Sequence, residues 1–182
     1  MAFFGAYMKI YWTKQKSDSR ELAAAAHRLY RGVPGSLCYN QNGRPYFQDS
    51  DIKISISHSG DIWLCVLGEY EAGIDIERVA DRDYIKIAQR FFTEAESLFV
   101  IRNGADGFFR LWARKEAYVK YTGLGISFGL GSFSLSDGNA LADSYNDVIF
   151  KEIDFGKDFK CAVCATKEAF DWTQITTEEM HI

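Results

Sequence analysis

The chain has 182 residues, a formal net charge of −4 at pH 7 and a hydrophobic content of 47%. These values suit one compact domain, or two small lobes that share a core, without disulfides to hold the fold together. Aromatic residues make up 15% of the chain, which argues against disorder. The negative balance excludes a global positive field that would attract nucleic acid or anionic lipid, so any site for a polyanionic ligand must be local.

The apolar N-terminus and the cysteines both have plain structural interpretations. The first ten residues lack a basic leader and a small-residue cleavage site, so we expect a strand there and not a targeting signal. No segment reaches the roughly 20 apolar residues that a membrane span needs. Cys161 and Cys164 invite a metal or redox interpretation, but they lie three apart on a predicted strand and therefore point to opposite faces. We expect core cysteines and a cytoplasmic protein.

The predicted elements mix strands and helices. The first are a strand at residues 3–11 and a helix at 19–30, with Asp18 or Ser19 as its N-cap and a stop at 32–35. Asn42-Gly43 predicts a two-residue turn. Further along we expect strands at 52–57, 63–67 and 73–77, helices at 83–90, 93–101 and 107–121, and strands at 132–136, 148–153 and 159–166. This pattern predicts an α+β fold of two lobes, residues 1–76 and 77–182.

The segment Gly73-Ile74-Asp75-Ile76-Glu77 carries two acids at strand spacing. Asp75 and Glu77 would share one face of the strand, roughly 7 Å apart, with the isoleucines on the other face. Two neighbouring carboxylates repel each other unless a cation lies between them, and Mg²⁺ takes one or two carboxylates while leaving room for phosphate oxygens. The alternative is an exposed strand face that happens to be acidic.

A helical stripe follows at residues 112–120. Trp112, Glu116 and Lys120 recur every four residues and so lie along one side of a helix. This stripe could serve a site, or it could be a solvated Glu–Lys pair beside a core tryptophan.

The segment Ser57-His58-Ser59 ends a strand whose isoleucines at 54 and 56 point inward. A nucleophile–base pair is one interpretation, but adjacent strand residues point to opposite faces, so His58 is poorly placed to activate Ser57. Phosphate recognition fits better, and a histidine that caps a turn is the structural alternative.

Taken together and in order, these segments resemble the Sfp-type 4′-phosphopantetheinyl transferases, relatives of holo-acyl-carrier-protein synthase. The motifs that carry the resemblance are Gly43-Arg44-Pro45, Ser57-His58-Ser59, Gly73 to Glu77, Arg90-Phe91-Phe92 through Glu96, and Trp112 to Lys120. The resemblance implies two similar α+β lobes about a pseudo-twofold axis, with coenzyme A in the cleft between them. It also implies a monomer, because the two lobes would form an internal pseudo-dimer.

The resemblance also implies roles for individual residues. Asp75, Glu77 and Glu116 would hold Mg²⁺, His58 and Lys120 would bind phosphates of coenzyme A, and Lys115 would add positive charge to the cleft. Arg20, Arg44 and Ser57 are candidates for the 3′-phosphate and adenosine end.

The implied reaction moves the 4′-phosphopantetheine group of coenzyme A to a serine of an apo acyl or peptidyl carrier protein and releases 3′,5′-ADP. For the base we expect Glu116, directly or through a water bound to the metal. Glu96 is the rival, but Thr93-Glu94-Ala95-Glu96 has the pattern of a capping box, in which Glu96 closes onto the backbone of Thr93. The Arg82 to Arg90 segment is the candidate surface for the carrier protein.

Two other functions use the same residues. A metal-dependent phosphohydrolase or nuclease could employ the same carboxylates, although a nuclease would need a basic track that the acidic balance does not favour. A non-catalytic paralogue that only binds carrier proteins is the third hypothesis.

Overall fold

The computed structural model describes residues 8–125, 128–166, 169 and 175–181. Its helices are α1 (Ser19–Arg31), α2 (Tyr84–Phe91) and α3 (Glu94–Thr122), with a short 3₁₀ helix, η2 (Leu130–Ser132). Its strands are β1 (Lys9–Thr13), β2 (Leu37–Tyr39), β3 (Pro45–Phe47), β4 (Lys53–Ser59), β5 (Ile62–Gly68), β6 (Ala72–Arg78), β7 (Ser144–Tyr145), β8 (Val148–Ile153), β9 (Phe159–Thr166) and β10 (Thr176–Glu179). The α+β class predicted from the sequence is confirmed. None of the described helices is long and apolar enough to cross a membrane.

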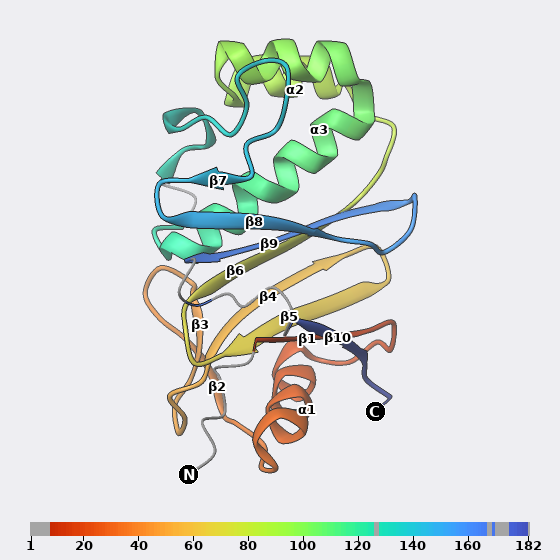
Figure 1. Cartoon of the computed structure of the whole chain (residues 1–182). Helices are drawn as coiled ribbons and strands as arrows, with labels where there is room; N and C mark the ends of the chain where they lie inside the picture. Colours follow the sequence, from red (N-terminus) through yellow and green to blue (C-terminus); the bar gives the residue numbers. More distant parts are fainter. Residues whose placement is uncertain (1–7, 126–127, 167–168, 170–174, 182) are drawn as a thin grey trace.

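Two four-stranded sheets form the middle of the molecule (Figure 1). The first has the order β10-β1-β5-β4 and the second the order β6-β9-β8-β7, and β2 pairs with β3 in a separate hairpin. Neighbouring strands are antiparallel except β1 and β10, which are parallel. The second sheet therefore contains β6, which spans the boundary proposed between residues 76 and 77.

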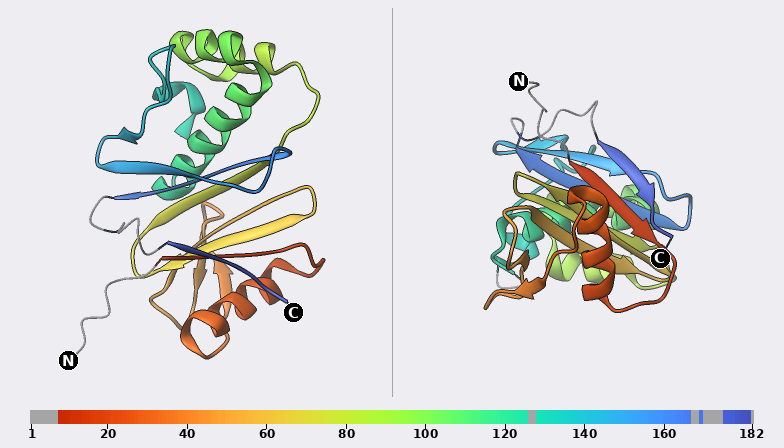
Figure 2. Two further views of the ribbon diagram at one scale, coloured as in Figure 1. Left: turned by 45° about the vertical axis from the view of Figure 1, so that its right-hand side comes forward. Right: turned by 90° about the horizontal axis from the view of Figure 1, so that it is seen from below.

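The elements stack in four layers, with α1 below the first sheet and α3 above the second (Figures 1 and 2). The central strands β5, β6 and β9 are buried on both faces along most of their length, so their alternating side chains fill the layers on both sides. Ile10 and Leu64 meet Ile74 and Val163 between the sheets. The other two clusters lie under the helices: Tyr11, Leu22 and Cys65 beside α1, and Phe108, Leu111 and Phe150 beside α3.

The two sheets also meet along a row of serine side chains, which we call the serine ladder (Ser55, Ser57 and Ser59). These three alternate residues of β4 accept hydrogen bonds from alternate backbone N–H groups of β6. The pairs are Ser55 with Ile74 at 3.2 Å, Ser57 with Ile76 at 3.3 Å, and Ser59 with Arg78 at 2.9 Å. Since buried N–H groups need a partner, the hydroxyls replace the backbone acceptors that a neighbouring strand would supply, and they fix β4 and β6 in one register.

Most of the predicted elements are confirmed. Helix α1 has Asp18 as its N-cap and ends at Gly32, whose φ of 83° is left-handed. The helices predicted at 93–101 and 107–121 form one element, α3, with a break at Gly104. The two-residue turn predicted at Asn42-Gly43 is wrong in its position and length: the chain turns at Gln41-Asn42, where Gly43 N–H donates to Asn40 O, within a five-residue connection between β2 and β3. Residues 3–7 of the first predicted strand lie outside the described residues.

The strand predicted at 132–136 is wrong. The segment follows η2 and makes only one isolated bridge, between Ser136 and Leu141. Phe133 and Leu135 alternate as buried residues because they pack against α3, and the α3 side chains of Lys115 and Glu96 bond to their backbone. Alternating buried residues, the pattern that predicted a strand, therefore occur here in a segment that has no neighbouring strand.

Candidate active site

A pocket of about 340 Å³ opens between β4, the β2–β3 hairpin and the C-terminal turns of α3. Four residues singled out from the sequence line it: Arg44, His58, Glu116 and Lys120. They come from both sides of the junction between the two sheets, so the fold brings together motifs that are far apart in the chain.

Asp75 lies in the middle of β6 and is only 4% exposed. Its Oδ1 atom accepts hydrogen bonds from Lys120 Nζ at 2.7 Å and from Ser57 Oγ at 2.8 Å. Its Oδ2 atom is buried and has no hydrogen-bond partner among the described residues. Burial raises the pKa of this carboxyl, and the Lys120 ammonium opposes that rise. An unsatisfied buried carboxylate oxygen is costly, so it points to a ligand that completes the site.

The negative charge of Asp75 acts on two further acids, Glu77 and Glu116. Burial raises the pKa of Glu77 to about 7, with further contributions from the negative charges of Asp75 and Glu116. Burial also raises the pKa of Glu116, and Asp75 adds to the effect. Three carboxylates that repel one another are the donor set that a hard divalent cation would neutralise. In the part of the chain that the structure describes, no three His, Cys, Asp or Glu side chains are already arranged to hold a metal ion.

The pKa of Glu77 predicts how the stability of the ligand-free protein depends on pH. The ordinary value of 4.5 applies to the unfolded chain and the value of about 7 to the folded protein, so the folded protein holds this proton more tightly. Relative to Glu77→Gln, the wild type is therefore expected to lose stability as pH rises from 4.5 to about 7. Urea denaturation of both proteins at a series of pH values measures this difference, and parallel curves would contradict the prediction.

Gly73 explains how α3 comes close enough to β6 for these contacts. A Cβ atom at this position would lie 1.8 Å from the carbonyl oxygen of Ala117 and 2.6 Å from the backbone nitrogen of Tyr121. The helix backbone therefore rests directly on the strand, and Glu116 and Lys120, on the same turns, project beside Asp75. The glycine of the Gly-Ile-Asp-Ile-Glu segment has a packing role that spacing alone did not reveal.

Glu96 and Lys115 lie away from the pocket, in the interior. Lys115 Nζ is 2.6 Å from Glu96 Oε1, and both side chains are fully buried. The capping box is confirmed, because Thr93 N donates to Glu96 Oε2 at 3.0 Å and Glu96 N donates to Thr93 Oγ1. Lys115 also donates to the carbonyl of Phe133 at 2.7 Å. The expectation that Lys115 adds charge to the cleft is therefore wrong: its ammonium is used within the core.

The buried pair predicts that Glu96→Gln acts on stability. The substitution leaves the Lys115 ammonium without a counter-charge in the interior, and we expect unfolding to become easier by about 3 kcal/mol. Urea denaturation measures the free energy of unfolding, and an assay of 4′-phosphopantetheine transfer to a carrier protein measures turnover, both on the same preparations. Replacing both partners, as Glu96→Gln with Lys115→Met, is expected to recover part of the stability. Loss of turnover with unchanged stability would instead make Glu96 the base.

The remaining predicted residues lie at different distances from the pocket. Ser57 is buried and turned toward Asp75, and it does not line the pocket. Arg20 is exposed in the first turn of α1, where its neighbour Ser19 reaches the pocket. Arg44 forms an ion pair with Glu71 at the pocket wall.

Trp112 belongs to the core and not to the site. Its ring packs 5.7 Å from Phe92 and 5.5 Å from Phe108.

Sequence reasoning missed Glu71, Tyr39 and Asn42, the last two of which line the pocket. No motif marks Glu71, which reaches the site only because the start of β6 lies beside the β2–β3 hairpin.

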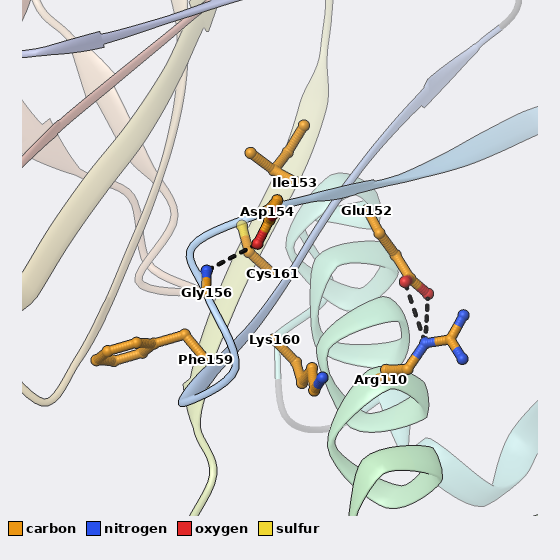
Figure 3. A pocket seen from close by; sticks show the side chains of 8 residues that line it. All are labelled: Arg110, Glu152, Ile153, Asp154, Gly156, Phe159, Lys160 and Cys161. Atoms are coloured by element: carbon orange, nitrogen blue, oxygen red, sulfur yellow. Dashed lines mark hydrogen bonds and ion pairs between the residues drawn. The ribbon is translucent and has the colours of Figure 1, made fainter.

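A second pocket, of about 210 Å³, lies at the β8–β9 connection beside α3 (Figure 3). Its basic side chains are already paired: Arg110 with Glu152 at 3.0 Å, and Lys160 with Asp106 at 2.6 Å. Because these charges neutralise one another, this pocket offers less for an anionic ligand than the one beside Asp75.

The chain belongs to the 4′-phosphopantetheinyl transferase superfamily, whose family model matches residues 71–174. It is 34% identical to the 4′-phosphopantetheinyl transferase Sfp of Bacillus subtilis over 151 residues, which cover 76% of this chain and 67% of that protein. It is 33% identical to the 4′-phosphopantetheinyl transferase gsp of Aneurinibacillus migulanus over 135 residues, 69% of this chain and 56% of the relative. A further 4′-phosphopantetheinyl transferase of Bacillus subtilis is 31% identical over 172 residues, 87% of this chain and 76% of that protein. The chain thus spans between about half and three quarters of these relatives.

Proposed function

We propose that this chain transfers the 4′-phosphopantetheine group of coenzyme A to a serine of an apo acyl or peptidyl carrier protein, releasing 3′,5′-ADP with the help of Mg²⁺. The family and the names of its relatives support this activity. The observation that carries the proposal is the buried Asp75 carboxylate, which has one unsatisfied oxygen and whose other oxygen is bonded to Lys120. Its charge acts on Glu77 and Glu116, and Lys120 and Glu116 line the pocket.

The residues divide into a cation site and a phosphate site. Asp75, Glu77 and Glu116 would hold Mg²⁺, which when bound would neutralise the diphosphate of coenzyme A. Lys120 and His58 line the pocket and would contact the phosphates. Lys120 would exchange its ion pair with Asp75 for the substrate, since phosphate oxygens are strong acceptors.

The 3′-phosphate would bind at the other end of the pocket. Arg44 lies there and would contact this group if its ion pair with Glu71 opens. Arg20, exposed in the first turn of α1 next to the pocket residue Ser19, would be a second cation for this group.

The reaction needs positioning and one proton acceptor. The carrier serine oxygen attacks the phosphorus that bears pantetheine, and the bond from that phosphorus to the bridging oxygen of 3′,5′-ADP breaks. The serine proton passes to the Glu116 carboxylate, which lines the pocket beside Lys120. Lys120 stabilises negative charge on the phosphate oxygens as the bond breaks.

The strand order supports two similar lobes related by a pseudo-twofold axis. In the first half the leading strand β1 pairs with β5, which pairs with β4; in the second half the leading strand β6 pairs with β9, which pairs with β8. Each half also packs a helix on its sheet (Figure 2). This repeat favours a division just before β6, at about residue 71, in place of residue 76. An internal pair of lobes would make a monomer sufficient for the cleft.

The carrier protein is proposed to meet α2 and its flanks. Arg90 of this helix lies beside the exposed ring of Phe91, and Ile85 is exposed on the same helix. A basic and apolar surface of this kind would complement an acidic helical carrier protein.

The deciding experiment incubates the protein with coenzyme A, Mg²⁺ and a panel of purified apo carrier proteins, followed by mass spectrometry of the carriers. We expect at least one carrier to gain the mass of a single 4′-phosphopantetheine group, and the gain to disappear with EDTA. Thermal shifts with coenzyme A, a phosphomonoester and DNA separate the alternatives. Stabilisation by a phosphomonoester and not by coenzyme A, with no carrier modified, would favour a phosphohydrolase.

A further inference from the structure

We propose that Ser57 is a positioning residue that orients Asp75 for metal binding, and that it does not contact coenzyme A. The inference rests on the proposed function, because it assigns Ser57 a part in the same reaction. It replaces the expectation that Ser57 serves the 3′-phosphate and adenosine end of the ligand.

The Ser57 hydroxyl is fully engaged inside the protein. The side chain is buried, the oxygen accepts a hydrogen bond from Ile76 N–H at 3.3 Å, and the hydroxyl donates its one hydrogen to Asp75 Oδ1 at 2.8 Å. A serine hydroxyl has a single donor, so none remains for a phosphate. The pocket is lined by the neighbours Ser55 and His58 but not by Ser57.

Two donors hold the same oxygen of Asp75. Ser57 and Lys120 both donate to Oδ1, which fixes the plane of the carboxylate and leaves Oδ2 as the oxygen without a partner. That oxygen is therefore the one directed to an incoming cation. A carboxylate held by fixed donors loses less conformational freedom on binding than one free to rotate.

The two hydrogen bonds to Asp75 differ in whether they would persist when a ligand binds. Lys120 is a long side chain, 30% exposed, that lines the pocket and is proposed to turn toward the phosphates of the substrate. Ser57 is short, buried and anchored through its own bond to β6. When Lys120 is engaged by a ligand, Ser57 is the donor that keeps Asp75 in place.

The serine ladder provides matched controls. Ser55 is as buried as Ser57, at 5% exposure, and accepts an equivalent bond from Ile74 N–H at 3.2 Å. Ser55→Ala thus removes a hydrogen bond between β4 and β6 without touching Asp75, and reports the cost of that bond alone. Ser59 accepts from Arg78 N–H and does not line the pocket, so Ser59→Ala serves as the control for activity.

The test compares Ser57→Ala with both controls by three measurements. These are kcat and KM for coenzyme A in the transfer assay, the affinity for Mn²⁺ by electron paramagnetic resonance with coenzyme A present, and calorimetric binding of coenzyme A in EDTA. For Ser57→Ala we expect a loss of about 10–100-fold in Mn²⁺ affinity and a fall in kcat at limiting Mg²⁺, with coenzyme A binding in EDTA unchanged. Ser57→Cys, which keeps a weak donor, is expected to fall between the wild type and Ser57→Ala.

Other outcomes would overturn the assignment. Weaker binding of coenzyme A in EDTA by Ser57→Ala, with Mn²⁺ affinity unchanged, would make Ser57 a ligand contact. Equal losses of Mn²⁺ affinity in Ser57→Ala and Ser55→Ala would reduce its role to holding the strands together. If the wild type modifies no carrier but binds Mn²⁺ in a manner that depends on Ser57, the proposed function fails while the positioning role stands.

Discussion

Glu116→Ala is expected to lower kcat for transfer by at least about 10³-fold while the protein remains folded. Glu116 is half-buried and lines the pocket, where the negative charge of Asp75 acts on it. We propose that it both holds Mg²⁺ and accepts the serine proton. Removing it deletes a charge that binds the cation and the acceptor for the proton. The measurement is the rate at which an apo carrier gains mass, with circular dichroism and thermal melting as checks of the fold.

The companion variants sharpen this prediction. Asp75→Ala is expected to have a comparable effect, because it removes the carboxylate at the centre of the proposed cation site. Glu94→Gln changes an exposed acid in the first turn of the same helix and is expected to retain wild-type turnover. Wild-type rates for Glu116→Ala or Asp75→Ala at limiting Mg²⁺ would contradict the assignment of both carboxylates.

Gly73→Ala is expected to reduce both stability and transfer. The added methyl group would lie 1.8 Å from the carbonyl oxygen of Ala117, a backbone atom that cannot move aside without shifting α3. We expect a loss of about 3 kcal/mol or more in the free energy of unfolding. Because Glu116 and Lys120 are on the displaced turns, kcat should also fall under conditions in which the variant remains folded.

A second glycine gives the control for Gly73→Ala. A Cβ atom at Gly131 would lie 3.3 Å from the carbonyl oxygen of Phe91, and Gly131 has no positive φ. Gly131→Ala is therefore expected to change stability by at most about 1 kcal/mol. Chemical denaturation of the three proteins measures the effect, and equal stability of Gly73→Ala and the wild type would mean that α3 does not rest on β6 in this way.

Much of the fold followed from local signals. The alternation along β4 and β6 and the capping signals of α1 and α3 predicted these elements correctly, since each reflects the chain's immediate neighbours. The spacing of Asp75 and Glu77, and of Glu116 and Lys120, also predicted which side chains would share a face. The family resemblance then implied that the two segments meet, and the hydrogen bond between Lys120 and Asp75 shows that contact.

The remaining features depend on contacts between distant segments. A strand pattern indicates that Ser57 and His58 face opposite ways, but not which face meets β6 and which meets the pocket. The helix pattern likewise leaves open whether Lys115 points to solvent or to Glu96. The short strand β10 is polar, with two threonines and two glutamates, and it is ordered by pairing with β1 and not by its own pattern.

The pairing of β10 with β1 has a consequence for how the protein is made. Lys9 of β1 lies opposite Thr176 of β10, and its ammonium is 2.7 Å from Glu178, so the partner of one of the first strands emerges from the ribosome only after β9. Until then β1 presents an open edge in the nascent protein, and such edges recruit foreign strands. Closing this sheet is a late event of biosynthesis, which makes the interval before it the period when a chaperone would matter most.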